Sequence, residues 1–335
     1  MKPALATILG VARHVPSACE ASLHAVERGR ITAAEIEKSR FSAVQVEDTL
    51  FPADMAVGVA RELTRPRADD ELRWCLYSHI HYQGQPALWS PASYILETIG
   101  KPAAMGLNIR QGCNAAMISV EIACSLLASE PGKTALCLAA DRFNISGFDR
   151  WNADYGIAYG DGAAGMLIGD RHRSEAVADI LAIRSTNAPF LERMHRHPVP
   201  MNEQDVEPYD IRATKKRFLA EQGTLALTTA TRTALMSLWA GIQSDADVRP
   251  EDIRYLVLPH LGYTLLTENY APVFDLPNAT SNLEEGLAVG HLGCADAFHG
   301  LRSLFESRPR PGSLALLVGA GAGFSWSLCL VRFRP

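Results

Sequence analysis

Short apolar stretches alternate with amphipathic stretches along most of the chain, a pattern typical of proteins that mix strands and helices. The apolar run at 4–12 predicts a first, central strand. Further strands are expected at 72–78, 134–140, 177–184, 252–260, 315–324 and 326–333, with a strand, turn and strand at 155–168. Helices are expected to begin at Thr32, to cover 52–63, 90–97 and 215–244, and to follow Cys113 as far as Ser129.

One of these helices has a chemically interesting start. Gly112 predicts a tight turn out of a strand that contains Leu107 and Ile109, and this turn places Cys113 in the first turn of a buried helix. The positive end of the helix dipole stabilises an anion, so a thiolate there is a ready nucleophile. Taken alone, however, a cysteine in an apolar run is more often an inert core residue.

The pattern breaks in the middle of the chain. The segment 189–210 is rich in proline and charge and has no apolar period, so we interpret 186–210 as a long surface loop or lid. His195 and His197 suggest a metal site there, but no carboxylate or thiol has ligand spacing with them, which favours a solvated loop. Strands and helices alternate on both sides, so we expect two similar α/β units, 1–185 and 211–335, with the site between them.

Composition and charge narrow the class of protein. The 335 residues are 47% hydrophobic and 21% charged, as in an ordinary globular protein, and the net charge of −5 argues against nucleic acid as a partner. Seven cysteines, an odd number without a CxxC pair, do not indicate a disulfide framework, and we expect a reducing cytoplasm. Neither a signal peptide nor a membrane-spanning segment is predicted. The Lys215-Lys216-Arg217 cluster is either a docking patch for an acidic carrier protein or simply a solvated face.

Three further motifs supply groups for acyl transfer. His260 follows an apolar strand, where open α/β sheets place functional side chains, although a buried structural histidine is equally compatible with that position. The run Gly290-His291-Leu292-Gly293-Cys294-Ala295-Asp296 offers a second histidine and a carboxylate. A cysteine, a histidine and an aspartate on separate loops provide a nucleophile, a base and an orienting carboxylate. The glycine-rich turn at 319–323 adds backbone N–H donors for an oxyanion.

Together these motifs resemble β-ketoacyl-acyl carrier protein synthase III, of the thiolase fold. The resemblance extends over nearly the whole chain in the same order and rests on Cys113, the run Tyr159-Gly160-Asp161-Gly162-Ala163, His260, Gly290–Gly293 and the C-terminal strands. It implies a five-layered αβαβα architecture of two pseudo-equivalent halves, usually a homodimer, with an acyl thioester on Cys113. It also implies an oxyanion hole formed by the backbone N–H groups of Cys113 and Ala322.

The departures from this family point to a subgroup. Condensing members have Gly-Asn where this chain has Gly290-His291, and that amide assists malonyl decarboxylation. The family's elements that hold the coenzyme A nucleotide have no clear match. The spacing of His291 and Asp296 resembles that of synthase III-like acyltransferases of polyketide and antibiotic biosynthesis. These proteins move an acyl group from a carrier protein or coenzyme A onto a hydroxyl or amine of a sugar or cyclitol.

By this resemblance the expected catalytic residues are Cys113, His260 and Asp296, while His291, Gly290 and Gly293 shape the pocket. A carboxylate beside His260 would orient the imidazole and increase its basicity toward an alcohol or amine. No metal and no resident cofactor are expected, because the acyl donor is a substrate. The alternatives are a decarboxylative condensing enzyme and a non-catalytic partner subunit, of which the latter usually lacks the nucleophile. The acyl group stays open, with Trp74, Tyr77, Tyr82 and Trp89 as possible lining of an aryl or short-chain pocket.

Overall fold

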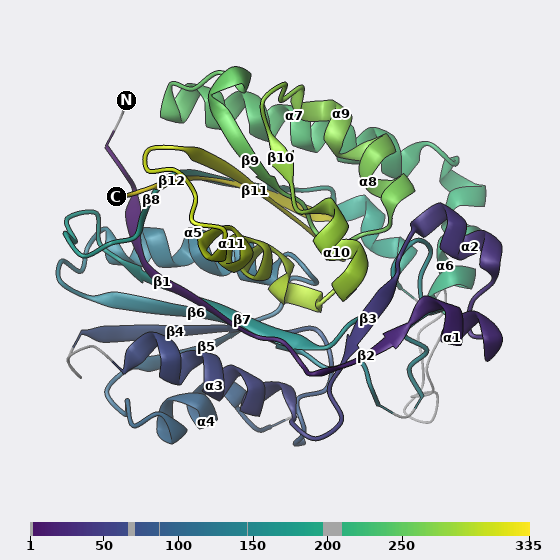
Figure 1. Ribbon diagram of the computed structural model, residues 1–335, viewed down its shortest axis with the longest axis horizontal. Coiled ribbons are helices and arrows are strands. Elements are labelled where there is room, and N and C mark those ends of the chain that lie inside the picture. Colours follow the sequence, from purple (N-terminus) through teal and green to yellow (C-terminus); the bar gives the residue numbers. More distant parts are fainter. Residues whose placement is uncertain (1–2, 66–70, 87, 146, 197–209) are drawn as a thin grey trace.

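The computed structural model describes residues 3–65, 71–86, 88–145, 147–196 and 210–335 (Figure 1). Ten strands of these residues join in one sheet, in the order β10-β9-β11-β12-β8-β1-β7-β6-β4-β5. The strands are β1 (Ala6–His14), β4 (Leu72–Ser78), β5 (Met105–Ile109), β6 (Thr134–Asp141), β7 (Gly162–Gly169), β8 (Ala178–Asn187), β9 (Ile253–Val257), β10 (Thr280–Ser281), β11 (Leu314–Gly321) and β12 (Ser325–Phe333).

The sheet consists of two halves with the same internal order. In the first half, β4 pairs parallel with β5 and β6, and β7 joins β6 to β1 in antiparallel fashion. In the second half, β9 pairs parallel with β10 and β11, and β12 joins β11 to β8 in the same way. The two halves meet where β1 pairs antiparallel with β8. The two halves of the sheet therefore have the same strand order, and β8 (Ala178–Asn187), which lies within the predicted units 1–185 and 186–210, pairs in the second half.

Helices and strands stack in five layers (Figure 1). The long helices are α3 (Pro52–Thr64), α4 (Pro91–Thr98), α5 (Ala115–Leu127), α6 (Ile211–Gln222), α7 (Ala226–Ala246) and α11 (Asp296–Glu306). Helix α3 covers the outer face of the first half and α7 that of the second, while α5 and α11 pack between the two halves. Because α5 and α11 have sheet on both sides, they are rich in small or apolar residues, and the inner faces of both half-sheets close over them as one core.

Shorter elements complete the fold. They are α1 (Ser22–Glu27), α2 (Ala33–Ser39), α8 (Tyr263–Asn269), α9 (Ala271–Phe274), α10 (Leu283–Val289), the antiparallel two-stranded sheet of β2 (Ala18–Ala21) and β3 (Ala43–Val46), and three short 3₁₀ helices, η1 (Pro189–Met194), η2 (Pro250–Asp252) and η3 (Gly293–Ala295). The predicted helix start at Thr32 is confirmed by a capping box in which Thr32 and Glu35 satisfy each other's backbone N–H groups. In the described part of the chain, we find no helix long and apolar enough to cross a membrane.

Most predicted elements are confirmed to within a few residues, with two differences. The segment before Gly162 is not a strand, because its backbone turns to contact the loop at His291 through a single bridge at Tyr159. The expected helix at 215–244 is two helices, α6 and α7, because Gly223 adopts φ +91° between them and ends the first. Most of the expected lid, including His197, lies outside the described residues.

Candidate active site

The nucleophile candidate lies in a turn that has room only for backbone. Gly112 adopts φ +54°, the left-handed region that favours glycine, and α5 begins at Ala115, so Cys113 lies just before the helix instead of in its first turn. A Cβ on Gly112 would collide with the backbone of Ala322, and a Cβ on Gly321 would collide with the backbone nitrogens of Cys113 and Asn114. The two turns therefore interlock, with the backbone of Ala322 against Gly112 and that of Gly321 against Cys113. The oxyanion hole of Cys113 and Ala322 stays a prediction.

Asn114 fixes the start of α5 to the opposite half of the molecule. Its side chain is fully buried, and its Nδ2 donates to the hydroxyls of Ser325 (3.1 Å) and Ser327 (2.9 Å) on β12. These hydrogen bonds tie the cysteine turn to the strand that follows the glycine-rich turn. The half-buried Cys113 side chain is thus held at the junction of the two halves.

Three side chains form a continuous hydrogen-bonded row at this junction. The Nε2 of His291 lies 3.0 Å from the Sγ of Cys113, and its Nδ1 lies 2.6 Å from the Oδ2 of Asp296. Asp296 is the first residue of α11, and its Oδ1 accepts a hydrogen bond from the backbone N–H of Leu292 at 2.8 Å. With Nδ1 donating to the carboxylate, Nε2 faces the sulfur as a proton acceptor, or as a donor once it is protonated.

The arrangement differs from the sequence-based expectation in one respect. We expected His260 between the cysteine and the aspartate, with His291 shaping the pocket, but the structure places His291 there. His260 lies on the other side of the carboxylate, where its backbone N–H donates to Asp296 at 2.8 Å and its Nδ1 lies 3.0 Å from the carbonyl oxygen of Gly290. The sequence feature that could have identified His291 as the partner of Asp296 is the five-residue spacing between them. A glycine-flanked turn that leads directly into a helix brings two such residues together.

Burial and the neighbouring charges shift the pKa values of His291 and Asp296 in opposite directions. Burial disfavours the charged imidazolium, but the Asp296 carboxylate and the Cys113 sulfur outweigh burial and hold the pKa of His291 well above its ordinary value. Burial likewise opposes ionisation of Asp296, yet His291 and His260 outweigh that effect and keep its pKa below its usual range. The site is therefore built to stabilise a carboxylate beside a protonated imidazole.

A cluster of aromatic side chains forms one wall beside His291. The ring of Tyr159 lies 5.4 Å from that of His291, and Phe143 and Phe148 lie 4.7 and 5.1 Å from Tyr159. His81 continues the cluster at 5.1 Å from Phe148. Aromatic side chains were expected near the site, but on other residues.

The aromatic residues proposed from the sequence have separate partners. The Tyr77 hydroxyl donates to Gln83 in the core, the Trp74 indole donates to Glu130, and Trp89 contacts Tyr94. Tyr82 is half-exposed and meets the edge of Phe51. These four residues do not line a common pocket, because the alternation of side chains along β4 sends Trp74 and Tyr77 to different faces.

A buried carboxyl group that the sequence analysis did not single out supports the His291 turn. Asp141 ends β6 and accepts hydrogen bonds from the backbone N–H groups of Ile80 (2.9 Å), His81 (2.8 Å) and Cys294 (3.3 Å). Gly293, at φ +63°, packs so closely on this carboxyl that a Cβ there would collide with it. Burial raises the pKa of Asp141 to about 7, although the three N–H donors act in the opposite direction.

The other expected features are placed as follows. His195 is partly buried against the ring of Phe324, 5.3 Å away, instead of being solvated. Among the described residues, no three His, Cys, Asp or Glu side chains are grouped to hold a metal ion.

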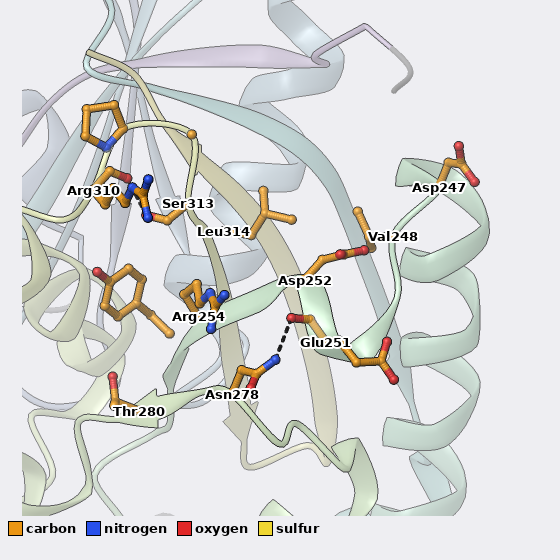
Figure 2. Close-up of a pocket in the computed structure, with 13 residues that line it drawn as sticks. Asp247, Val248, Glu251, Asp252, Arg254, Asn278, Thr280, Arg310, Ser313 and Leu314 are labelled. Carbon is orange, nitrogen blue, oxygen red and sulfur yellow. Dashed lines mark hydrogen bonds between the residues drawn. The ribbon is translucent and has the colours of Figure 1, made fainter.

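Figure 2 shows a charged surface depression lined by Glu251, Arg254, Arg310 and their neighbours. This depression lies at the amino ends of β9 and β11, whereas His260 and Ala322 follow the carboxyl ends of the same strands.

The comparisons with known proteins agree with this architecture. The family model of 3-oxoacyl-[acyl-carrier-protein] synthase III matches residues 107–186, and the model of its C-terminal part matches residues 244–333, together just over half of the chain. The β-ketoacyl-[acyl-carrier-protein] synthase III of Aquifex aeolicus (strain VF5) is 21% identical over 246 residues, which are 73% of this chain and 72% of that protein.

Solved structures are similar over almost the full length. ChlB3, an acyltransferase, matches with a TM-score of 0.91 and 26% identity over 98% of both chains. The 3-oxoacyl-[acyl-carrier-protein] synthase III from Aquifex aeolicus VF5 matches with a TM-score of 0.77 and 18% identity over 98% of this chain and all of that chain. The chain therefore belongs to the 3-oxoacyl-[acyl-carrier-protein] synthase III family, with its thiolase-like fold, and is an enzyme of the acyl-transferring type.

Proposed function

We propose that this enzyme transfers an acyl group from a carrier-protein or coenzyme A thioester, by way of Cys113, to a hydroxyl or amine of a sugar-like or cyclitol-like natural-product acceptor. The observation that carries the proposal is the row from the Cys113 sulfur through His291 to Asp296, with contacts of 3.0 and 2.6 Å. A nucleophile, a base and an orienting carboxylate in this order form an acyl-transfer site.

In the first step, the Cys113 sulfur attacks the carbonyl carbon of the donor thioester. The C–S bond to Cys113 forms, the bond to the donor sulfur breaks, and the proton held by His291 leaves with the donor thiol. The backbone N–H groups of Cys113 and Ala322 are the proposed donors to the oxyanion, which the interlocked turns support.

In the second step, the acceptor attacks the acyl group on Cys113. His291 removes the proton from the attacking hydroxyl or amine, and the Asp296 carboxylate stabilises the imidazolium that forms. The new ester or amide bond replaces the thioester, Cys113 leaves as a thiolate, and the proton stays on His291. The starting protonation state is thus regenerated, and no atom changes its oxidation state in either step.

The same residues argue against decarboxylative condensation. In the condensing members of the family, a side-chain amide assists the loss of carbon dioxide from the malonyl group. This chain has in its place the imidazole of His291, which is paired with Asp296 at 2.6 Å. The replacement of that amide by His291 therefore supports transfer to a heteroatom.

Two partners belong to this proposal. A carrier protein is the expected donor. In the basic cluster, Lys215 is bound internally to Asp154 at 2.6 Å and Arg217 donates to the carbonyl oxygen of Arg196 at 3.4 Å, so the docking patch would rest mainly on the exposed Lys216. A second copy of the chain is the other partner. Its support is the outer edge of β5, which pairs with no strand in the described part of the chain and exposes half of Met105.

The experiment is intact-protein mass spectrometry with a panel of acyl-carrier and acyl-coenzyme A donors. We expect an adduct on the wild type, none on Cys113→Ala, and loss of the adduct when an amine or alcohol acceptor is added. An adduct that persists on Cys113→Ala contradicts the role of this residue. Release of carbon dioxide from a malonyl carrier, with formation of a carbon–carbon bond, would identify the condensing reaction instead.

A further inference from the structure

The second buried histidine of the site is not used in the mechanism above. The side chain of His260 is 1% exposed, and it follows β9 through Pro259, next to Asp296. Such a histidine costs free energy to bury unless its nitrogens are used. Its contacts therefore indicate what it does.

One ring nitrogen of His260 has a defined partner and the other does not. Nδ1 lies 3.0 Å from the carbonyl oxygen of Gly290, which can only accept, so Nδ1 carries the hydrogen. Nδ1 also lies 3.5 Å from Oδ1 of Asp296. Nε2 is buried and has no hydrogen-bond partner among the described residues.

His260 contacts the two groups that orient the imidazole ring of His291. The Gly290 carbonyl belongs to the peptide bond that joins Gly290 to His291. The His260 backbone N–H donates to Oδ2 of Asp296, the same oxygen that faces Nδ1 of His291. His260 thus contacts the backbone immediately before His291 and the carboxylate that orients its ring.

Close packing around Gly290 leaves the backbone of this turn little room to move. Gly290 adopts φ +84°, and a Cβ there would lie 2.8 Å from a methyl of Val44. The backbone of His291 is fixed on the other side, where its N–H donates to Ala158 and its carbonyl accepts from Gly160. The ring of His260 is in turn packed edge-on against His299, 5.3 Å away.

We infer that His260 is a positioning residue, which acts through its Nδ1–H on the Gly290 carbonyl and through its backbone on Asp296, so that the ring of His291 is held against the sulfur. This inference rests on the proposed function for its catalytic consequence, but not for its effect on the cysteine. A displacement of His291 by a fraction of an ångström weakens its contact with Sγ, and misplacements near 1 Å cost on the order of 100-fold in rate.

A matched pair of amide variants distinguishes the two ring nitrogens. The amide nitrogen of His260→Asn replaces Nδ1, whereas the longer His260→Gln places its amide where Nε2 lies. The rate of Cys113 alkylation by iodoacetamide, the rate of acyl-enzyme formation, and kcat and KM for the acceptor are measured for both variants and for His260→Ala. Circular dichroism verifies folding, and if the alanine variant does not fold, the amide pair alone decides.

We expect His260→Ala and His260→Gln to lower kcat and the alkylation rate about 10- to 100-fold with KM within about twofold, and His260→Asn to restore most of both. Rescue by Gln but not by Asn would overturn the inference, because Nε2 would then be the working atom. Wild-type rates in all three variants would also overturn it. Alkylation needs neither acyl donor nor acceptor, so rescue of alkylation by Asn without any acyl transfer means that the proposed function fails while this inference stands.

Discussion

At the scale of single residues, the reactivity of Cys113 depends on the imidazole 3.0 Å away. We predict that His291→Asn, which replaces that imidazole by an uncharged amide, slows both iodoacetamide alkylation of Cys113 and acyl transfer by about 10²- to 10⁴-fold. Alkylation is followed by mass spectrometry of the peptide that contains Cys113. His24→Asn, at an exposed position of α1, is the control and should behave as the wild type.

The Asp296 carboxylate acts on the second step more than on the first. Transfer to the acceptor requires His291 to take up a proton, and the carboxylate is the main group that favours its protonated form against burial. We therefore predict that Asp296→Asn slows discharge of a preformed acyl-enzyme by about 100-fold, with a smaller effect on its formation. Chase experiments with an isolated acyl-enzyme measure this rate. Equal loss in both steps would show that the carboxylate serves the two proton transfers alike.

Asp141 gives a pH-dependent prediction about stability. Its pKa rises from an ordinary value of 3.8 to about 7 on burial, so between these pH values the folded state holds a proton that the unfolded state has lost. This contribution is full below the unfolded pKa and is lost as the pH rises through the folded pKa. We predict that Asp141→Asn gains stability relative to the wild type from pH 4 to pH 7, by up to about 1.4 kcal/mol per pH unit. Urea denaturation at several pH values measures the difference, and a constant difference contradicts the prediction.

At the scale of elements, the interlocked turns make a prediction about glycine. Gly112→Ala combines the left-handed conformation, which costs about 1–2 kcal/mol, with a collision against Ala322, which costs about 1–3 kcal/mol. Gly132→Ala is the matched control, because Gly132 has φ +77° but open space around its Cβ position. We expect both variants to lose unfolding free energy in urea and Gly112→Ala alone to lose acyl-enzyme formation. If Gly112→Ala costs no more than Gly132→Ala, the turns are not interlocked in solution.

Elements with a strong apolar period could be predicted from the sequence, and residues in turns could not. The strands at 72–78, 134–140 and 326–333 are buried over most of their length, so their composition identifies them. The segment before Gly162 also contains apolar residues, but long-range contact with the His291 loop determines its backbone. A local pattern does not contain that contact.

The same limit explains which site residues could be found. Cys113 and Asp296 were recognisable because each stands at the start of a helix, whereas the order of the two histidines depends on how the Gly290 turn folds against Ala158 and Gly160. Asp141 was missed because its partners are backbone N–H groups of two distant loops, which no spacing records. The sequence thus identifies the chemical groups, and tertiary packing decides which of them touch.

At the scale of the whole molecule, the open edge of β5 predicts association. Two copies that pair along this edge would have twice the 36.4 kDa mass of the chain in light scattering. We predict that Met105→Lys, which places a charge on the edge strand, shifts the protein toward the monomer. Met236→Lys on the outer helix α7 is the control, because Met236 is also exposed but lies away from the edge. A monomeric wild type would contradict the proposed dimer.

The contact between His291 and the Cys113 sulfur has a consequence for the waiting intermediate. A base that can deprotonate an alcohol can also deprotonate water, so an acyl group held on Cys113 is exposed to hydrolysis. Hydrolysis then competes with transfer to the acceptor. When the acceptor is scarce, the acyl group is released as the free acid and the donor is consumed without product. Exclusion of water from Cys113 until the acceptor binds is therefore as important for this enzyme as a high rate of transfer.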